Sequence, residues 1–274
     1  MSRKKVQVLS IPYILWVIGF TVIPLLFVFA KAATNAEGDL TLEYLLAIFD
    51  PVHRKALLLS IALAFTTSLI CVVISYPVAL ILKTSKFKNT KIIMFVMILP
   101  MWMNFILRIL AIQLLISKNG VINHLLSMLN LPSLNIINTP AAIVVGMVYD
   151  YLPYMLLPVL NCVLAIPDDI IEAGKDLGAG RLRVFTRILL PLSLSGIGSG
   201  ITMVFVPSMT EFVIANILGG GKIQLLGNVI EQEFSVSMNW NLGSGLSVAL
   251  MVFVLITTFL FGHDSSGSNR NFVL

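Results

Sequence analysis

The chain has 274 residues, of which 58% are hydrophobic and only 11% are charged. Soluble domains average about 25% charged residues, so this composition excludes an ordinary soluble domain and indicates one transmembrane domain over residues 1–274. The net charge of +5 does not indicate nucleic-acid binding, because the lysines and arginines gather in particular loops, as membrane topology requires.

Six apolar segments are long enough to cross the hydrocarbon layer, which takes a helix of about 20 residues. They lie at about 9–30, 56–82, 92–116, 141–164, 192–217 and 243–262. The predicted fold class is therefore an all-α membrane protein with six transmembrane helices. Ala30-Lys31-Ala32 loosely fits a signal-peptide cleavage site, but the apolar stretch before it exceeds the usual 7–15 residues, so we expect an anchored first helix.

The lysines and arginines of the short loops predict the orientation, because cytoplasmic loops carry an excess of them. One side holds twelve, at Arg3, Lys4, Lys5, Lys83, Lys86, Lys88, Lys91, Lys175, Arg181, Arg183, Arg187 and Arg270, and the other holds five, at Lys31, Arg54, Lys55, Lys118 and Lys222. Both chain ends are thus predicted to be cytoplasmic.

The three outward loops carry turn signals. We expect a short surface helix within 31–55 and another within 117–140, where Leu125, Leu126 and Leu129 lie between turn residues. Residues 219–242 open with Gly219-Gly220-Gly221, a flexible turn. The tail from His263 is polar and is expected to be solvated. We find no internal repeat, so the inverted-repeat design of many secondary transporters is not supported.

Three ionisable residues lie inside predicted spans, namely Arg108, Asp150 and Glu211. Such groups cost several kcal/mol in the bilayer, so they face a partner or a cavity. Either Arg108 pairs with Asp150 or Glu211 and only ties helices together, or the acids line a pathway and attract ammonium groups. In the second case tyrosines such as Tyr154 add cation–π contact. Prolines at 100, 153, 158 and 207 mark expected breaks or kinks.

The sequence lacks the signals of a metal site or of nucleotide hydrolysis. Cys71 and Cys162 both fall in apolar segments and indicate neither a disulfide nor a metal centre. There is no phosphate-binding loop and no GxGxxG turn. Clustered His, Cys or Ser–Lys pairs are also missing from the spans. We therefore expect no metal, no cofactor and no enzymatic activity in this chain.

The cytoplasmic segment between the fourth and fifth spans, at about 167–191, has an ordered pattern. Pro167 ends the fourth span, and Asp168 or Asp169 is expected to cap a helix, with Glu172 completing an acidic capping box in the latter case. Gly178 then stands where a helix would turn. A second basic amphipathic stretch follows, from Arg181 to Leu190, and Pro191 starts the fifth span.

Two interpretations of this loop remain open on physical grounds. It is either an ordinary positive-inside loop or a short rigid knob that inserts into the groove of a partner. A topogenic loop needs charge, but it does not need a glycine bend between two amphipathic halves.

The segment closely resembles the EAA loop of bacterial ABC importer permeases. The matching residues are Glu172, Ala173, Asp176, Leu177, Gly178, Ala179, Phe185, Ile188, Leu190, Pro191, Leu192, Gly196 and Ile197; Gly174, Gly180 and Ser195 depart from the pattern. The resemblance implies a type I importer permease fold, with a coupling helix that sits in a cleft of a cytoplasmic ATPase. By the same resemblance, Glu172, Ala173, Asp176, Gly178, Ala179, Arg181 and Pro191 would couple to that ATPase.

Further segments look like the permease of spermidine/putrescine importers. They are Ile98 to Trp102 with Arg108, Gly146 to Tyr149, Pro207 to Val213, Gly219-Gly220 and Leu226 to Ile230. This resemblance implies polyamine import with a second homologous permease, an ABC ATPase dimer that binds the ATP, and an extracytoplasmic polyamine-binding protein. Rival hypotheses are the same architecture importing ferric iron, phosphonate or an oxyanion, and a stand-alone proton-coupled carrier that uses Asp150 and Glu211.

Overall fold

The computed structural model describes residues 11–35, 37–84 and 90–262, and these are helical apart from turns and one isolated bridge between Thr34 and Leu40. Six apolar helices are long enough to cross a membrane: Ile11–Ala32, Pro51–Thr84, Phe105–Met128, Pro140–Ala165, Arg181–Met209 and Trp240–Phe259. The predicted all-α class with six membrane helices is confirmed. The basic residues 3–5, Lys86, Lys88 and the tail from His263 lie outside the described residues.

The chain divides into two compact units. One comprises the residues up to Leu57 together with Val229–Val254, and the other comprises Leu58–Asn228 together with the residues from Leu255 onward. Each unit is described by itself, and the single domain expected over 1–274 stays a prediction.

In the first unit, the N-terminal helix contains a π-helical segment, η1 (Ile18–Val22), and continues as α2 (Ile23–Ala32). The expected surface helix within 31–55 is present as α3 (Glu43–Leu46) and the 3-10 turn η2 (Ala47–Phe49). The unit also holds most of α13 (Leu226–Ser235) and of α14 (Trp240–Gly262). The sequence pattern did not predict α13.

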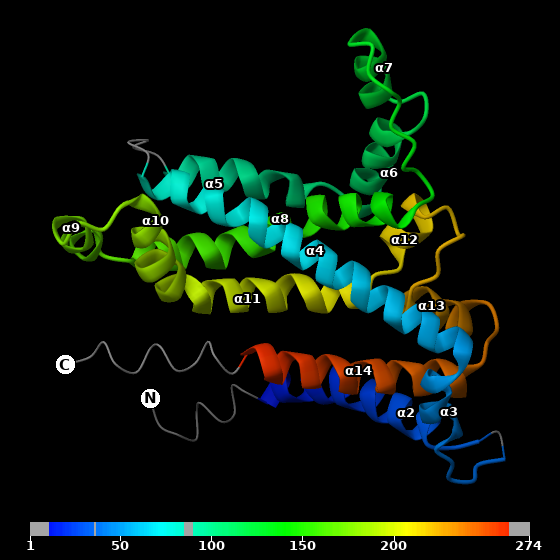
Figure 1. The fold of residues 1–274 in the computed structure, drawn as a ribbon. Helices are drawn as coiled ribbons and strands as arrows, with labels where there is room; N and C mark the ends of the chain where they lie inside the picture. The colour runs from blue at the N-terminus through cyan, green and yellow to red at the C-terminus, as the bar shows by residue number, and fades with distance from the viewer. Residues whose placement is uncertain (1–10, 36, 85–89, 263–274) are drawn as a thin grey trace. The chain divides into compact units, whose positions relative to one another are not determined.

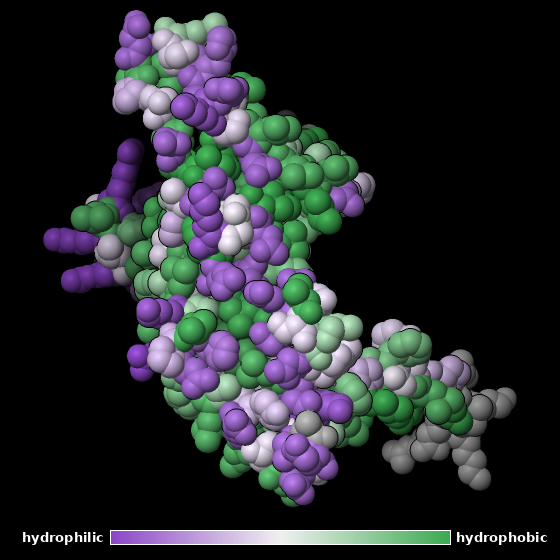
Figure 2. Space-filling model, turned by 90° about the vertical axis from the view of Figure 1, so that its right-hand side faces the viewer, coloured by the Kyte–Doolittle hydropathy of each residue, from purple (hydrophilic) through white to green (hydrophobic). Residues whose placement is uncertain are grey.

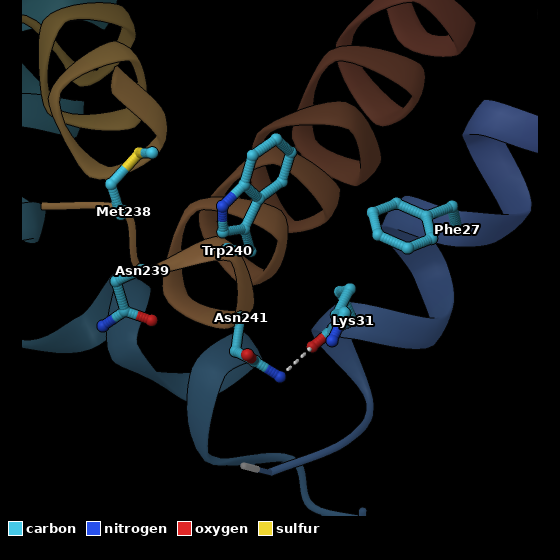
Figure 3. Close-up of a pocket in the computed structure, with 6 residues that line it drawn as sticks. All are labelled: Phe27, Lys31, Met238, Asn239, Trp240 and Asn241. Carbon is cyan, nitrogen blue, oxygen red and sulfur yellow. Dashed lines mark hydrogen bonds between the residues drawn. The ribbon is translucent and has the colours of Figure 1, made fainter. Parts of the chain in front are cut away.

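Contacts between α2 and α14 surround a cavity of about 370 Å³ (Figure 3). The Trp240 ring meets Phe27 edge to face at 6.4 Å. The Asn241 side-chain amide donates to the backbone oxygen of Lys31 over 3.1 Å. The ammonium group of Lys31 lies 5.9 Å from the centroid of the Phe27 ring. These contacts fix the end of α2 against the start of α14.

The second unit is built around α4 (Pro51–Thr84), α8 (Pro140–Ala165) and α11 (Leu190–Met209), with α8 and α11 side by side (Figure 1). Glycines allow the close approach: a Cβ at Gly196 would lie 2.7 Å from Cys162 Cβ, and one at Gly200 would lie 2.5 Å from Met155 Sδ. Small residues at four-residue spacing are a common device of membrane helix pairs, because van der Waals packing drives their association.

The third apolar segment, predicted over 92–116 with a break or kink at Pro100, is interrupted there. It forms α5 (Thr90–Ile98), the 3-10 turn η3 (Leu99–Trp102) and α6 (Phe105–Ile116). Pro100 cannot donate a backbone hydrogen bond, and Asn104 restarts the helix by accepting a 3.2 Å bond from Leu107 N. Asn104 is therefore the N-cap of α6. The expected helix of the next loop is α7 (Val121–Met128).

The fifth span is also shifted from the predicted 192–217. Helical structure runs from Arg181 to Met209, and α12 (Val213–Leu218) is a separate helix after a break at Thr210. Pro207 lies in the last turn of α11, which explains the end of the helix. In Figure 1, α12 lies at the opposite end of this unit from α9 (Asp168–Asp176) and α10 (Arg181–Val184). Figure 2 views the right-hand side of Figure 1 and shows hydrophilic residues mixed with apolar ones on that face.

Candidate functional sites

The loop that follows α8 forms a short helix, α9, that ends at a glycine turn. Gly178 has φ +79°, its N–H donates to Lys175 O over 2.9 Å, and Ala179 N donates to Gly174 O over 3.0 Å. This pair of bonds is the Schellman motif, in which a left-handed residue satisfies the last carbonyls of a helix. The predicted sequence of helix, glycine turn and helix is confirmed.

The start of α9 differs from the expectation. Its N-cap is Pro167, with no side-chain cap, and Asp168 already lies within the helix, so the capping box with Asp169 and Glu172 is wrong. The Asp168 carboxylate instead lies 3.2 Å from the ammonium nitrogen of Lys83. The second half of the loop differs too: α10 passes through the π segment η4 (Phe185–Leu189) into α11 without a break.

The surface of α9 combines charged and apolar side chains. Glu172, Ala173 and Asp176 are exposed, and Leu177 is 89% exposed, the highest fraction among the large apolar residues that the structure describes. No hydrogen bond or ion pair of the Glu172 or Asp176 carboxylate is found within the described part of the chain. Exposed apolar surface on an ordered helix marks an interaction site.

The loop is anchored to the spans through Lys83 at the end of α4. Its ammonium group donates to Ile166 O over 2.6 Å and pairs with Asp168, although the side chain is only 8% exposed. A cation is favourable there, because Ile166 follows the C-terminal end of α8, where the helix dipole is negative. A cavity of about 800 Å³ lies between α4 and the loop, and its wall includes Lys83, Ala179 and Arg181.

A second candidate site lies among the spans. The Arg108 guanidinium, on α6, forms an ion pair with the Asp150 carboxylate, on α8, and the two side chains are only 9% and 6% exposed. Arg108 Nη1 also donates to Pro100 O over 2.9 Å, and its Cζ lies 5.7 Å from the Phe105 ring centroid. The structure thus selects Asp150, not Glu211, as the partner of Arg108.

Glu211 has a different set of partners, at the break between α11 and α12. Its Oε2 accepts a 2.5 Å hydrogen bond from the Tyr151 hydroxyl, and its Oε1 accepts a 3.0 Å bond from Ile214 N. The second bond satisfies a free N–H in the first turn of α12, where the helix dipole favours an anion. Tyr154 is 40% exposed, and its ring lies 6.3 Å from that of Tyr151.

The predicted site residues therefore fall into two groups. Glu172, Ala173, Asp176, Gly178, Ala179 and Arg181 share the loop at one end of the unit, and Pro191 lies in the first turn of α11. Arg108, Asp150, Tyr154 and Glu211 gather around the middle of α8 and the end of α11. The described residues contain no cluster of three or more His, Cys, Asp or Glu side chains suited to a metal.

Sequence reasoning missed two residues that organise these sites. Lys83 was counted only for topology, yet it ties α4 to the loop. Asn228 is buried and donates to Phe212 O and to Asn216 Oδ1, while its own Oδ1 accepts from Leu225 N, so it joins both ends of the turn after α12. The sequence analysis had noted Asn228 only as part of the segment Leu226 to Ile230 that resembles polyamine permeases, and it did not predict this role.

Six apolar helices and an exposed loop helix that ends at a glycine turn are the features of an integral membrane protein with an ordered loop between its fourth and fifth spans. The model of the family described as "Binding-protein-dependent transport system inner membrane component" matches residues 75–265, and the chain belongs to this family. It is a multi-pass permease subunit of a bacterial ABC importer.

Two curated relatives match nearly the whole chain. The spermidine/putrescine transport system permease protein PotB of Haemophilus influenzae is 32% identical over 98% of this chain and 97% of its own length. The PotB protein of Escherichia coli K12 is 30% identical over 93% of this chain and 96% of its own length. The chain also resembles a solved bacterial alginate ABC transporter in complex with an alginate-bound periplasmic protein, with TM-score 0.80 and 15% identity over 95% of this chain and 93% of that one. This last similarity shows the fold alone.

Proposed function

We propose that this permease imports polyamines, with spermidine and putrescine as the substrate class. The observation that carries the proposal is the similarity over nearly the full length to permeases named for these two substrates. The charge cluster supports it, because Asp150 and Glu211 bring two carboxylates against one guanidinium, which favours a cationic solute over an oxyanion or phosphonate.

The energy for transport is supplied by partners. A second homologous permease completes the pathway, an extracytoplasmic polyamine-binding protein delivers the solute, and a cytoplasmic ABC ATPase dimer binds and hydrolyses ATP. This chain itself is not an enzyme and holds no cofactor. The exposed Leu177 and the ordered turn at Gly178 support α9 as the part that the ATPase holds.

The orientation follows from this role. With α9 in the cytoplasm of a bacterial inner membrane, both chain ends lie on the cytoplasmic side, and α12 lies toward the outside. Because α8 leads into α9 through only Ile166 and Pro167, closure of the ATPases would move α8 directly. Lys83 would carry the same motion to α4.

Uptake of labelled spermidine and putrescine tests the substrate. In cells that lack other polyamine importers, deletion of this gene should abolish uptake, and an unchanged rate would overturn the polyamine assignment. Competition with ferric iron, phosphonate and oxyanions in the same cells identifies a different solute.

Copurification tests the machine independently of its cargo. The intact permease should retain an ATPase, and the double variant Glu172→Lys, Gly178→Trp should lose it while remaining in the membrane. A stand-alone carrier would purify without an ATPase and would be unaffected by these loop substitutions.

A further inference from the structure

Arg108 spans the break in the third apolar segment. It lies in α6, yet its guanidinium donates to the backbone oxygen of Pro100, in the turn η3 before the break. The same guanidinium holds Asp150 on α8. One side chain therefore clamps η3, α6 and α8 together, and the clamp depends on Asp150, because a carboxylate is the strongest of its hydrogen-bonding partners.

The charges around this clamp do not balance. The Asp150 carboxylate pairs directly with Arg108, and the next residue, Tyr151, holds the Glu211 carboxylate. Two carboxylates therefore lie near the single guanidinium of Arg108. The Glu211 carboxylate is stabilised by hydrogen bonds from the Tyr151 hydroxyl and from Ile214 N in the first turn of α12, and neither donor is a cation. The arrangement thus has capacity for one more cation.

A cavity of about 210 Å³ opens directly beside the pair, with Arg108, Tyr149 and Asp150 in its wall. Since a water molecule takes up about 30 Å³, the space admits more than a single small ion. The rest of the wall is largely apolar and includes Met97, Met101 and Leu156. A carboxylate and an aromatic ring beside apolar surface suit an ammonium group on a methylene chain.

We propose that Asp150 is an exchange site, at which an ammonium group of the cargo competes with the Arg108 guanidinium for the carboxylate. When the ammonium group holds Asp150, Arg108 keeps only Pro100 and the Phe105 ring, and the clamp between α6 and α8 is released. Because α8 continues toward α9, the release signals that cargo is present to the coupling loop. The inference rests on the proposed function, which supplies a cationic cargo.

The test uses the full complex of both permeases, ATPase and binding protein in nanodiscs and in proteoliposomes. Three variants are compared with the wild type: Arg108→Gln, Asp150→Asn and the two together. Lys118→Gln is the matched control, because it removes one positive charge from an exposed position. Assembly is checked in each case by the amount of ATPase that copurifies.

An exchange site predicts that Arg108→Gln raises ATP hydrolysis without cargo several-fold, because the clamp is already open. Asp150→Asn should lower spermidine uptake at least tenfold, and the double variant should remain as low because the exchanging carboxylate is still missing. If the ion pair is merely structural, the double variant should behave differently, because it leaves no unpaired charge. Its uptake should then return toward the wild-type rate, and this result would overturn the proposal. Unchanged cargo-free hydrolysis in an assembled Arg108→Gln complex would also overturn it.

The two proposals fail in different ways. If the wild-type complex moves no polyamine, the substrate assignment is wrong, whereas the cargo-free ATPase activity of Arg108→Gln still reports on the clamp. If wild-type uptake of spermidine is normal and the double variant matches it, the substrate assignment stands and the exchange site is wrong.

Discussion

The Tyr151 hydroxyl donates a 2.5 Å hydrogen bond to Glu211 Oε2 and thereby ties the middle of α8 to the break between α11 and α12. Both side chains are buried. Asp150, the neighbouring residue, carries the contact to Arg108, so consecutive residues of α8 hold two interrupted segments. This helix therefore connects the buried cluster to the loop that contains α9.

Removal of the Tyr151 hydroxyl should weaken this connection. Tyr151→Phe leaves Glu211 with only its bond to Ile214 N, and we expect a loss of about 1 kcal/mol, typical of a hydrogen bond between membrane helices. Thermal unfolding of the purified permease measures the loss. Tyr149→Phe, at an exposed position of the same helix, should leave the midpoint unchanged. Equal midpoints for the two variants would contradict the assigned bond.

The turn after α9 depends on a glycine. Gly178→Ala forces an L-residue into φ +79°, at a cost of roughly 1–2 kcal/mol, although nothing within 4 Å would obstruct its Cβ. We expect weaker retention of the ATPase in a pull-down assay. Gly180→Ala is the matched control, because Gly180 also has open space but a φ of −67°. If the two variants behave alike, the left-handed turn is not what orders the loop.

Leu177 should contribute to partner binding without contributing to the fold. Because the Leu177 side chain is exposed, folding of this chain buries little of its apolar surface. Leu177→Asp should therefore not change the thermal midpoint. Truncation of an apolar anchor in an interface costs about 2 kcal/mol or more, which is roughly a thirtyfold loss of affinity for the ATPase. Leu40→Asp, at an 87% exposed residue of the loop between α2 and α3, serves as control. Undiminished binding by Leu177→Asp would exclude this residue from the interface.

The packing of α8 on α11 should not tolerate a larger residue at Gly196. A Cβ there would lie 2.7 Å from the backbone oxygen of Pro158 and 2.7 Å from Cys162 Cβ, so Gly196→Val requires the helices to separate. Overpacking of this kind costs about 1–3 kcal/mol. Gly19→Val, where nothing lies within 4 Å, is the comparison. The yield and thermal midpoint of the solubilised protein are the measurements, and a well-folded Gly196→Val variant would refute the close approach.

Much of this protein could be predicted from its sequence, because the bilayer imposes simple rules. Backbone groups in hydrocarbon must be satisfied within a helix, so long apolar segments predicted the six spans without any knowledge of their neighbours. The turn at Gly178 could also be predicted, since a left-handed turn favours glycine whatever surrounds it. The spacing from Glu172 to Pro191 was enough to show a resemblance to the EAA loop of importer permeases.

Other features were decided by contacts between segments far apart in the sequence. A break or kink was expected at Pro100, but periodicity and composition did not show how the chain continues after it. Arg108 donates to the Pro100 carbonyl, and Asn104 caps the helix that restarts. The cap expected at Asp168 or Asp169 failed for a similar reason, since Asp168 lies inside the helix and pairs with Lys83 of a distant span.

The sequence by itself determined the class of protein, the number of its spans and the place of the loop helix between the fourth and fifth spans, all of which follow from local composition and spacing. Only the tertiary structure decided that Arg108 pairs with Asp150 and that Glu211 bonds to Tyr151. The physical reason is that a buried charge must find a partner, but its choice among several depends on how the helices cross and where they break. The pairing of Arg108 with Asp150 places the proposed site for an ammonium group beside Asp150.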